Sequence, residues 1–138
     1  MKTLIIIPSR MSATRLPGKP LLKINGQSII SHVFKRAESA NIGDVIVATE
    51  DQEILDEVKN NGGNAILTSK NHQTGTDRIF EALNLLNKQD INFIMNVQGD
   101  EPDIDIKDIK LLDTHMKKNN SKIGTLAAHI IDDKMYEN

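Results

Sequence analysis

Short apolar runs alternate along the chain with longer stretches in which apolar residues recur every three or four positions. The first run is Leu4, Ile5, Ile6 and Ile7, and four similar runs follow it. Runs of Ile and Val without polar alternation are typical of parallel strands that are buried on both faces. The pattern therefore predicts an α/β fold, with a mainly parallel sheet covered by helices. The expected strands are 3–7, 44–49, 64–68, 92–98 and 122–131.

The stretches between the strands predict four helices, because their apolar residues repeat at helical spacing. Ser28 and Asp51 are expected to cap the first two, since such side chains accept hydrogen bonds from the first unpaired N–H groups. The third helix is expected to begin at Thr76 or Asp77. Its predicted buried stripe is Ile79, Phe80, Leu83 and Leu86. The expected helices are 29–40, 52–61, 76–86 and 105–118.

The overall composition narrows the classes of function. A chain of 138 residues is expected to form one domain, spanning 1–138. Its net charge of −2 argues against a general nucleic-acid-binding surface. The absence of cysteine excludes a disulfide framework, a thiolate metal site and a cysteine nucleophile. The N-terminus lacks the layout of a signal peptide and no apolar run is long enough for membrane insertion, so we expect a cytoplasmic protein.

A cationic loop follows the first predicted strand. Between Pro8 and Leu21 the chain carries Arg10, Arg15 and Lys19. Several other residues of this loop are small or carry hydroxyl groups: Ser9, Ser12 and Thr14. Ligands of open α/β sheets gather at the carboxyl ends of the strands, where this loop is expected to lie. Three cations and accessible backbone N–H groups at that edge predict a site for an anion such as a triphosphate.

Two further polar loops are expected at the same edge. The loop after the third strand contains Gly75, which permits close backbone approach just before a helix N-terminus. The fourth strand ends in Gln98, Gly99 and Asp100. The amide of Gln98 has the donor and acceptor that a base edge requires, and the carboxylate of Asp100 suits Mg²⁺ that bridges phosphates. Taken alone, the Gly99-Asp100 dipeptide is a common turn.

Other nucleotide and hydrolase chemistries lack their motifs. The first strand is followed by neither a Walker A sequence nor a GxGxxG sequence, and the chain has no Gly-x-Ser-x-Gly elbow. Phosphoryl or nucleotidyl transfer depends mainly on cations, a metal ion and positioning. The three polar loops supply those groups.

In combination, the three loops resemble those of the 3-deoxy-manno-octulosonate (KDO) cytidylyltransferases. Ile7-Pro-Ser-Arg10 with the run from Ser12 to Leu21 resembles the CTP-phosphate loop of that family. The run His72-Gln-Thr-Gly-Thr-Asp-Arg78 is similar to its nucleotide-contacting loop, and Asn96-Val-Gln-Gly-Asp-Glu-Pro102 to its metal-bearing strand end. The similarity covers nearly all of the chain. It implies a three-layer, Rossmann-like nucleotidyltransferase fold.

The resemblance also implies roles for individual residues. Arg10, Arg15 and Lys19 would hold the phosphates of CTP and act as the catalytic cations, and Asp100 would ligate Mg²⁺. The residues expected to line the cytidine pocket are Ser9, Gly75, Arg78 and Gln98. The implied reaction joins KDO to CTP, yielding CMP-KDO and pyrophosphate for lipopolysaccharide biosynthesis. Lys19 and Mg²⁺ would stabilise the charge that develops on the phosphoryl oxygens.

Two alternatives stay open at this point. Members of the family continue through a second half that resembles nothing in this chain, and that half holds a second metal carboxylate, most of the sugar-acid pocket and much of the homodimer contact. We therefore expect a nucleotide-binding portion, either active or a non-catalytic CTP-binding fragment. Sialic acid cytidylyltransferases share the fold, but their Gly-Ser-Lys and Pro-x-Lys-Asn patterns differ from Ala-Thr-Arg15 and Pro-Gly-Lys-Pro20 here. The KDO reading is favoured.

Overall fold

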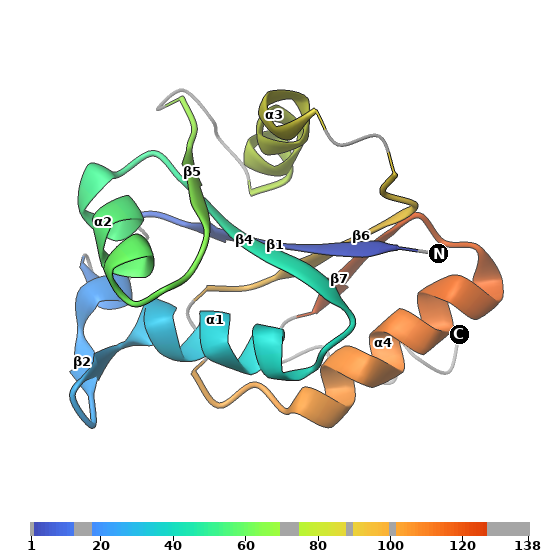
Figure 1. Ribbon diagram of the computed structural model, residues 1–138, viewed down its shortest axis with the longest axis horizontal. Helices are drawn as coiled ribbons and strands as arrows, with labels where there is room; N and C mark the ends of the chain where they lie inside the picture. The colour runs from blue at the N-terminus through green and yellow to red at the C-terminus, as the bar shows by residue number, and fades with distance from the viewer. Residues whose placement is uncertain (1, 13–17, 70–74, 88–89, 100–101, 127–138) are drawn as a thin grey trace.

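A five-stranded parallel sheet forms the centre of the computed structural model (Figure 1), which describes residues 2–12, 18–69, 75–87, 90–99 and 102–126. The strand order is β5-β4-β1-β6-β7, and each neighbouring pair is parallel. The α/β fold with a parallel sheet is thus confirmed. The strands are β1 (Thr3–Ser9), β4 (Gly43–Thr49), β5 (Ala65–Leu67), β6 (Phe93–Val97) and β7 (Ile123–Leu126).

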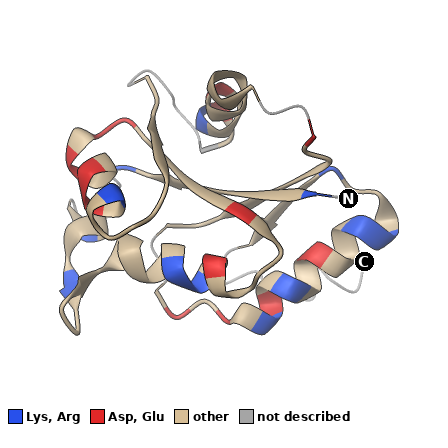
Figure 2. Cartoon of the chain, viewed as in Figure 1, with Lys and Arg blue, Asp and Glu red and all other residues tan. Residues whose placement is uncertain are grey.

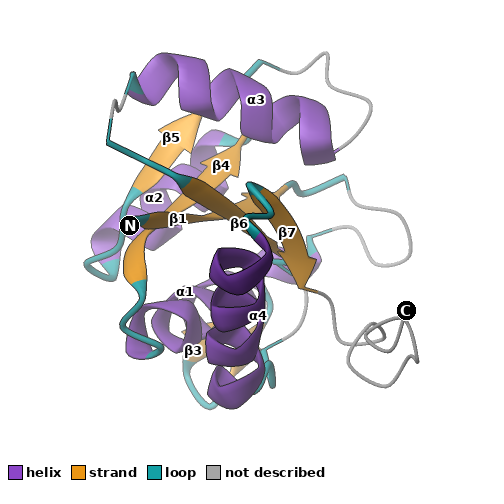
Figure 3. Cartoon of the chain, turned by 90° about the vertical axis from the view of Figure 1, so that its right-hand side faces the viewer, coloured by secondary structure: helices purple, strands orange, loops and turns teal. Residues whose placement is uncertain are grey.

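Helices cover both faces of the sheet, which gives three layers. Helices α1, α2 and α4 lie on one face and α3 lies on the other (Figures 1 and 3). Alternate side chains of β1 lie on opposite faces of the sheet. Ile5 and Ile7 belong to the larger core, whereas Leu4 and Ile6 pack with α3. The unbroken apolar run of β1 is therefore explained by burial on both sides. The helices are α1 (Ile29–Ser39), α2 (Gln52–Asn60), α3 (Gly75–Leu86) and α4 (Ile106–Asn119).

Most predicted boundaries lie within two residues of the observed ones, with two corrections to side-chain roles. Ser28 caps α1 as expected, because its Oγ accepts a hydrogen bond from the N–H of Ser31 at 3.2 Å. Asp51 precedes α2, but its side chain makes no capping hydrogen bond. Phe80 is half-exposed, and Ala82 is buried in its place. The two sit about 200° apart around α3, and only one side of that helix meets the sheet. The described part of β7 ends at Leu126, so the predicted continuation to residue 131 lies outside the described residues.

A small element that the sequence analysis missed lies between the cationic loop and α1. It consists of a 3₁₀ turn, η1 (Lys19–Leu21), and a hairpin of β2 (Lys23–Ile24) and β3 (Gln27–Ser28). Asn25 and Gly26 form its two-residue turn with φ values of 53° and 82°. Positive φ at both positions is the requirement of a type I′ turn, for which Asn-Gly is a strong signal.

The chain reverses its direction of winding across the sheet at β1. From β1 it proceeds to β4 and β5 on one side and then returns to β6 and β7 on the other. Open α/β sheets bind ligands at such a switch point, beyond the carboxyl ends of the strands, which here means the ends of β1 and β6. Among the described residues, no helix has the length and apolarity needed to cross a membrane.

Candidate functional site

Close packing brings the loop after β6 against the end of β1. A Cβ atom added to Gly99 would lie 3.0 Å from the carbonyl oxygen of Pro8 and 3.3 Å from Cγ2 of Ile7. A side chain at position 99 would therefore require β1 or the backbone at Gly99 to shift by a few tenths of an ångström. The preceding residue, Gln98, donates its backbone N–H to the carbonyl of Leu126 at 3.2 Å. Gln98 is therefore held by its own backbone at the carboxyl edge, beside the switch point.

Arg10 and Lys19, the two described cations of the loop after β1, lie on either side of a backbone hydrogen bond. The N–H of Gly18 donates to the carbonyl oxygen of Met11 at 2.8 Å, so residues 11 and 18 are neighbours in space. Arg10 precedes this pair and Lys19 follows it, and both side chains are partly exposed. Within the described ranges, neither forms a salt bridge. These two charges are thus available to an anion; Arg15 lies outside the described residues.

Two buried polar atoms near this edge have no hydrogen-bond partner among the described residues. They are the Oγ of Ser9 and the Oδ1 of Asn96, and each of these residues is 7% exposed. Ser9 ends β1 on the side of the larger core, whereas Asn96 pairs with Ile6 and faces the α3 side. Buried polar groups without partners are costly and uncommon. The Ser9 hydroxyl, at the end of its strand, is the better placed of the two to receive a ligand atom.

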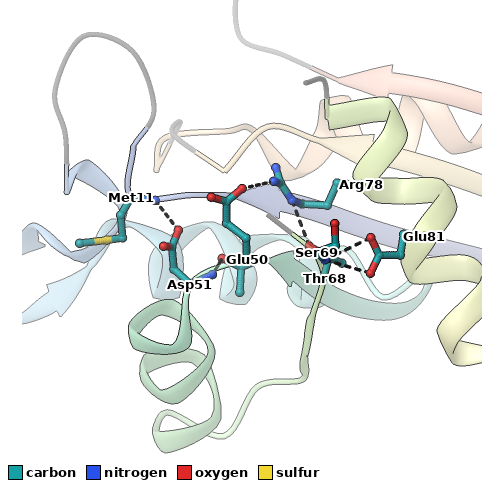
Figure 4. A network of polar contacts seen from close by, with 8 residues as sticks. Met11, Glu50, Asp51, Thr68, Ser69, Arg78 and Glu81 are labelled. Carbon is teal, nitrogen blue, oxygen red and sulfur yellow. Dashed lines mark hydrogen bonds and ion pairs between the residues drawn. The ribbon is translucent and has the colours of Figure 1, made fainter. Parts of the chain in front are cut away.

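Arg78 lies in a buried polar network rather than on an open surface (Figure 4). Its Nε donates to Oγ1 of Thr68 at 3.1 Å, and its Nη2 forms an ion pair with Glu50. The side chains of Arg78 and Glu50 are only 4% and 14% exposed. Two sides of the guanidinium are therefore committed to the protein. A direct contact of Arg78 with cytidine stays a prediction.

The start of α3 holds the end of β5 through a second contact. Both carboxylate oxygens of Glu81 accept the N–H of Ser69, at 2.9 and 3.1 Å (Figure 4). Together with the Arg78–Thr68 bond, this contact joins the first turns of α3 to the chain just before the predicted nucleotide loop. Gly75 is the first residue of α3, so the helix begins one residue before the earlier of the two predicted starts, Thr76 and Asp77. His72 and the rest of residues 70–74 lie outside the described residues.

The candidate metal ligand Asp100 also lies outside the described residues, directly after Gly99. Among the residues that are described, no group of three or more histidine or acidic side chains is arranged to hold a metal ion. Mg²⁺ commonly takes only one or two carboxylates and completes its shell with water and phosphate oxygens. The carboxylate of Asp100 has the donor chemistry for such an ion, and its role as a metal ligand stays a prediction.

Sequence reasoning missed the acidic turn between β4 and α2. Glu50 pairs with Arg78, and the Oδ2 of the next residue, Asp51, accepts the N–H of Met11 at 2.8 Å (Figure 4). Figure 2 shows acidic positions gathered at this turn and along α2. Glu50 and Asp51 directly follow the second predicted strand, which is β4, and this position at the ligand edge was the signal in the sequence for a role at the site. Asp51 was instead assigned to helix capping.

Comparisons with known proteins identify the family to which the chain belongs. A family model described as cytidylyltransferase matches residues 4–138. The 3-deoxy-manno-octulosonate cytidylyltransferase of Nitrobacter winogradskyi is 48% identical over 130 residues, which are 94% of this chain and 51% of the relative. That of Fusobacterium nucleatum is 45% identical over 139 residues, covering 100% of this chain and 56% of the relative. This chain thus spans about half the length of these relatives.

Solved structures show the same fold. A CMP:2-keto-3-deoxy-manno-octonic acid synthetase complexed with CTP superposes with a TM-score of 0.80 at 40% identity, covering 88% of this chain and 49% of that one. A cytidylyltransferase from Leptospira borgpetersenii gives a TM-score of 0.73 at 30% identity, covering 88% of this chain and 51% of the other. In both, the region that matches is about half of the solved chain.

Proposed function

The chain belongs to the cytidylyltransferase family, and we propose that it is the nucleotide-binding portion, residues 1–138, of an enzyme that activates KDO with CTP. The observation that supports this proposal is that Arg10 and Lys19 follow the carboxyl end of β1, where Gly99 packs against Pro8, and that neither cation forms a salt bridge with another described residue. The relatives that support the sugar acid are named KDO cytidylyltransferases and are 45% to 48% identical.

In the proposed reaction, the anomeric hydroxyl oxygen of KDO attacks the α-phosphorus of CTP. A new P–O bond forms, the bond from the α-phosphorus to the bridging oxygen breaks, and pyrophosphate leaves, while the hydroxyl proton passes to solvent or a base. Arg10, Arg15 and Lys19 hold the phosphates and offset the negative charge that builds up on their oxygens. Ser9, Gly75, Arg78 and Gln98 orient the cytidine. Mg²⁺, held by Asp100, supplies Lewis-acid stabilisation of the phosphoryl oxygens when bound.

A CTP-binding role without turnover is the second candidate, because this chain spans about half the length of its relatives. In that case the chain folds and binds CTP but does not catalyse the transfer. The two candidates make the same prediction for CTP binding and differ only in turnover.

The deciding experiment measures pyrophosphate release by the purified 138-residue chain with CTP, Mg²⁺ and KDO. We expect release that depends on KDO and falls at least about a hundredfold in Lys19→Ala, as is typical when one transition-state electrostatic group is removed. Lys23→Ala is the matched control, because Lys23 is an exposed lysine on β2 and should leave the rate unchanged. CTP binding measured by calorimetry without release would select the non-catalytic candidate, and no CTP binding would refute both. Release with a sialic acid in place of KDO would overturn the sugar-acid assignment.

A further inference from the structure

Asp51 is anchored to β4 and reaches toward the cationic loop. Its backbone N–H donates to Oγ1 of Thr49 at 3.1 Å, and Thr49 is a fully buried residue at the end of β4. Thr49 also pairs in register with Ser9, the last residue of β1. The carboxylate of Asp51 is therefore carried by a rigid part of the sheet.

That carboxylate fixes the position of Met11. Its Oδ2 accepts the backbone N–H of Met11 at 2.8 Å, and this bond is partly buried. A hydrogen bond to a carboxylate is about twice as strong as one between neutral groups, and partial burial protects it from competition by water. The backbone immediately after Arg10 is thereby tied to β4.

Met11 in turn fixes Gly18. The carbonyl oxygen of Met11 accepts the N–H of Gly18 at 2.8 Å, and the N–H of Leu21 donates to the carbonyl of Gly18 at 3.0 Å. Lys19 lies between Gly18 and Leu21, at the first position of η1. A continuous series of hydrogen bonds thus runs from β4 through Asp51 and Met11 to the backbone on which Lys19 stands.

The Asp51 side chain bonds to Met11 instead of capping α2, although its position in the sequence suggests a cap. Asp51 occupies the N-cap position of α2, yet its side chain makes no hydrogen bond to that helix. A side-chain cap is worth about 1 kcal/mol to a helix. At α2 this contribution is absent, while the same carboxylate holds the loop.

We propose that Asp51 is a positioning residue that sets the spacing of Arg10 and Lys19 for the phosphates of CTP. The inference rests on the proposed function, since it assigns the anion to CTP. Asp51 itself does not contact the nucleotide. Its removal lets the backbone at Met11 and Gly18 move, so that the two cations no longer meet the phosphates together.

The test compares CTP with cytidine, which lacks the phosphates, as ligands of the full chain. Asp51→Ala is expected to weaken CTP binding about tenfold, the effect of losing one charge-assisted hydrogen bond, and to leave cytidine binding unchanged. Asp51→Asn should lose less than about threefold, because its amide oxygen still accepts the N–H of Met11. The matched control is Asp56→Asn, which removes the same charge from an exposed residue of α2; among the described residues its side chain bonds to Gln52 of the same helix, at 2.9 Å.

A second measurement does not depend on CTP. Hydrogen exchange of the Met11 and Gly18 amides in the ligand-free chain should be faster in Asp51→Ala, at both amides, and unchanged in Asp56→Asn. CTP binding equal to wild type in Asp51→Ala would overturn the inference, as would equal losses for CTP and cytidine. If the wild-type chain binds no CTP, the proposed function fails; faster exchange at both amides would then still support the positioning role, and unchanged exchange would overturn it.

Discussion

Replacing Glu50 with alanine should destabilise the fold strongly, because it leaves the guanidinium of Arg78 buried without its carboxylate partner. The Arg78 side chain is only 4% exposed, and its described contacts are the ion pair with Glu50 and the bond to Thr68. Removing one member of a buried ion pair costs about 3–5 kcal/mol, since the remaining charge stays desolvated. Glu50 is 14% exposed and Arg78 retains Thr68, so we expect the lower end, about 3 kcal/mol.

A loss of this size is a large fraction of the 5–15 kcal/mol that stabilises a typical domain. For a chain of this length it corresponds to a fall in Tm of about 10 °C. Urea unfolding followed by circular dichroism measures the free energy of unfolding, and a thermal scan gives Tm. The double variant Glu50→Ala with Arg78→Met should be more stable than Glu50→Ala alone, because it removes the unpaired charge and keeps a side chain of similar length.

The control is Asp90→Ala, which breaks the exposed pair of Asp90 with Lys2. Those side chains are 64% and 57% exposed, and their Nζ–Oδ2 distance is 2.9 Å. The hydrogen bond to Asp90 and the negative charge of that residue raise the pKa of Lys2 above its usual value. We expect no measurable change in Tm, because exposed pairs contribute little. Equal losses in Glu50→Ala and Asp90→Ala, or a double variant less stable than Glu50→Ala alone, would refute the argument from burial.

Two further predictions concern the metal ion and the surface. Asp100→Asn should weaken the binding of Mg-CTP far more than that of metal-free CTP, and equal losses by calorimetry would contradict its role as a metal ligand. Phe80, Leu85 and Ile123 are about half-exposed large apolar side chains on α3 and β7, so the chain should self-associate as its concentration rises. Light scattering that shows a monodisperse monomer throughout would contradict this.

Much of the fold could be predicted from local pattern. Each strand of the five-stranded sheet starts within two residues of its predicted start, because a short unbroken apolar run such as Leu4 to Ile7 is typical of a strand buried on both faces. Ser28 was identified as a cap from its place before an amphipathic stretch. The helical spacing was not precise enough to identify every buried residue. Phe80 fits that spacing loosely, but it lies to the side of the surface of α3 that meets the sheet.

The candidate site was only partly predictable for a related reason. Arg10, Lys19 and Gln98 can be proposed from the sequence because their residue types suit the chemistry and each follows, or lies near, a recognisable strand; their roles stay predictions. The partners that hold the site, Glu50 and Asp51, are ordinary acidic residues in sequence. Their roles depend on Arg78 and Met11, which lie 28 and 40 positions away along the chain.

The sequence by itself determined the alternation of strands and helices, the edge at which polar loops follow the strands, and the family to which those loops belong. These features follow from local hydrophobic pattern and from residue types at fixed spacing. Only the tertiary structure decided that β1 is the switch point, that Arg78 is buried against Glu50, and that the Asp51 carboxylate serves the loop after β1 instead of α2. The physical reason is that strand order and side-chain pairing are settled by packing between distant segments, which no local pattern records.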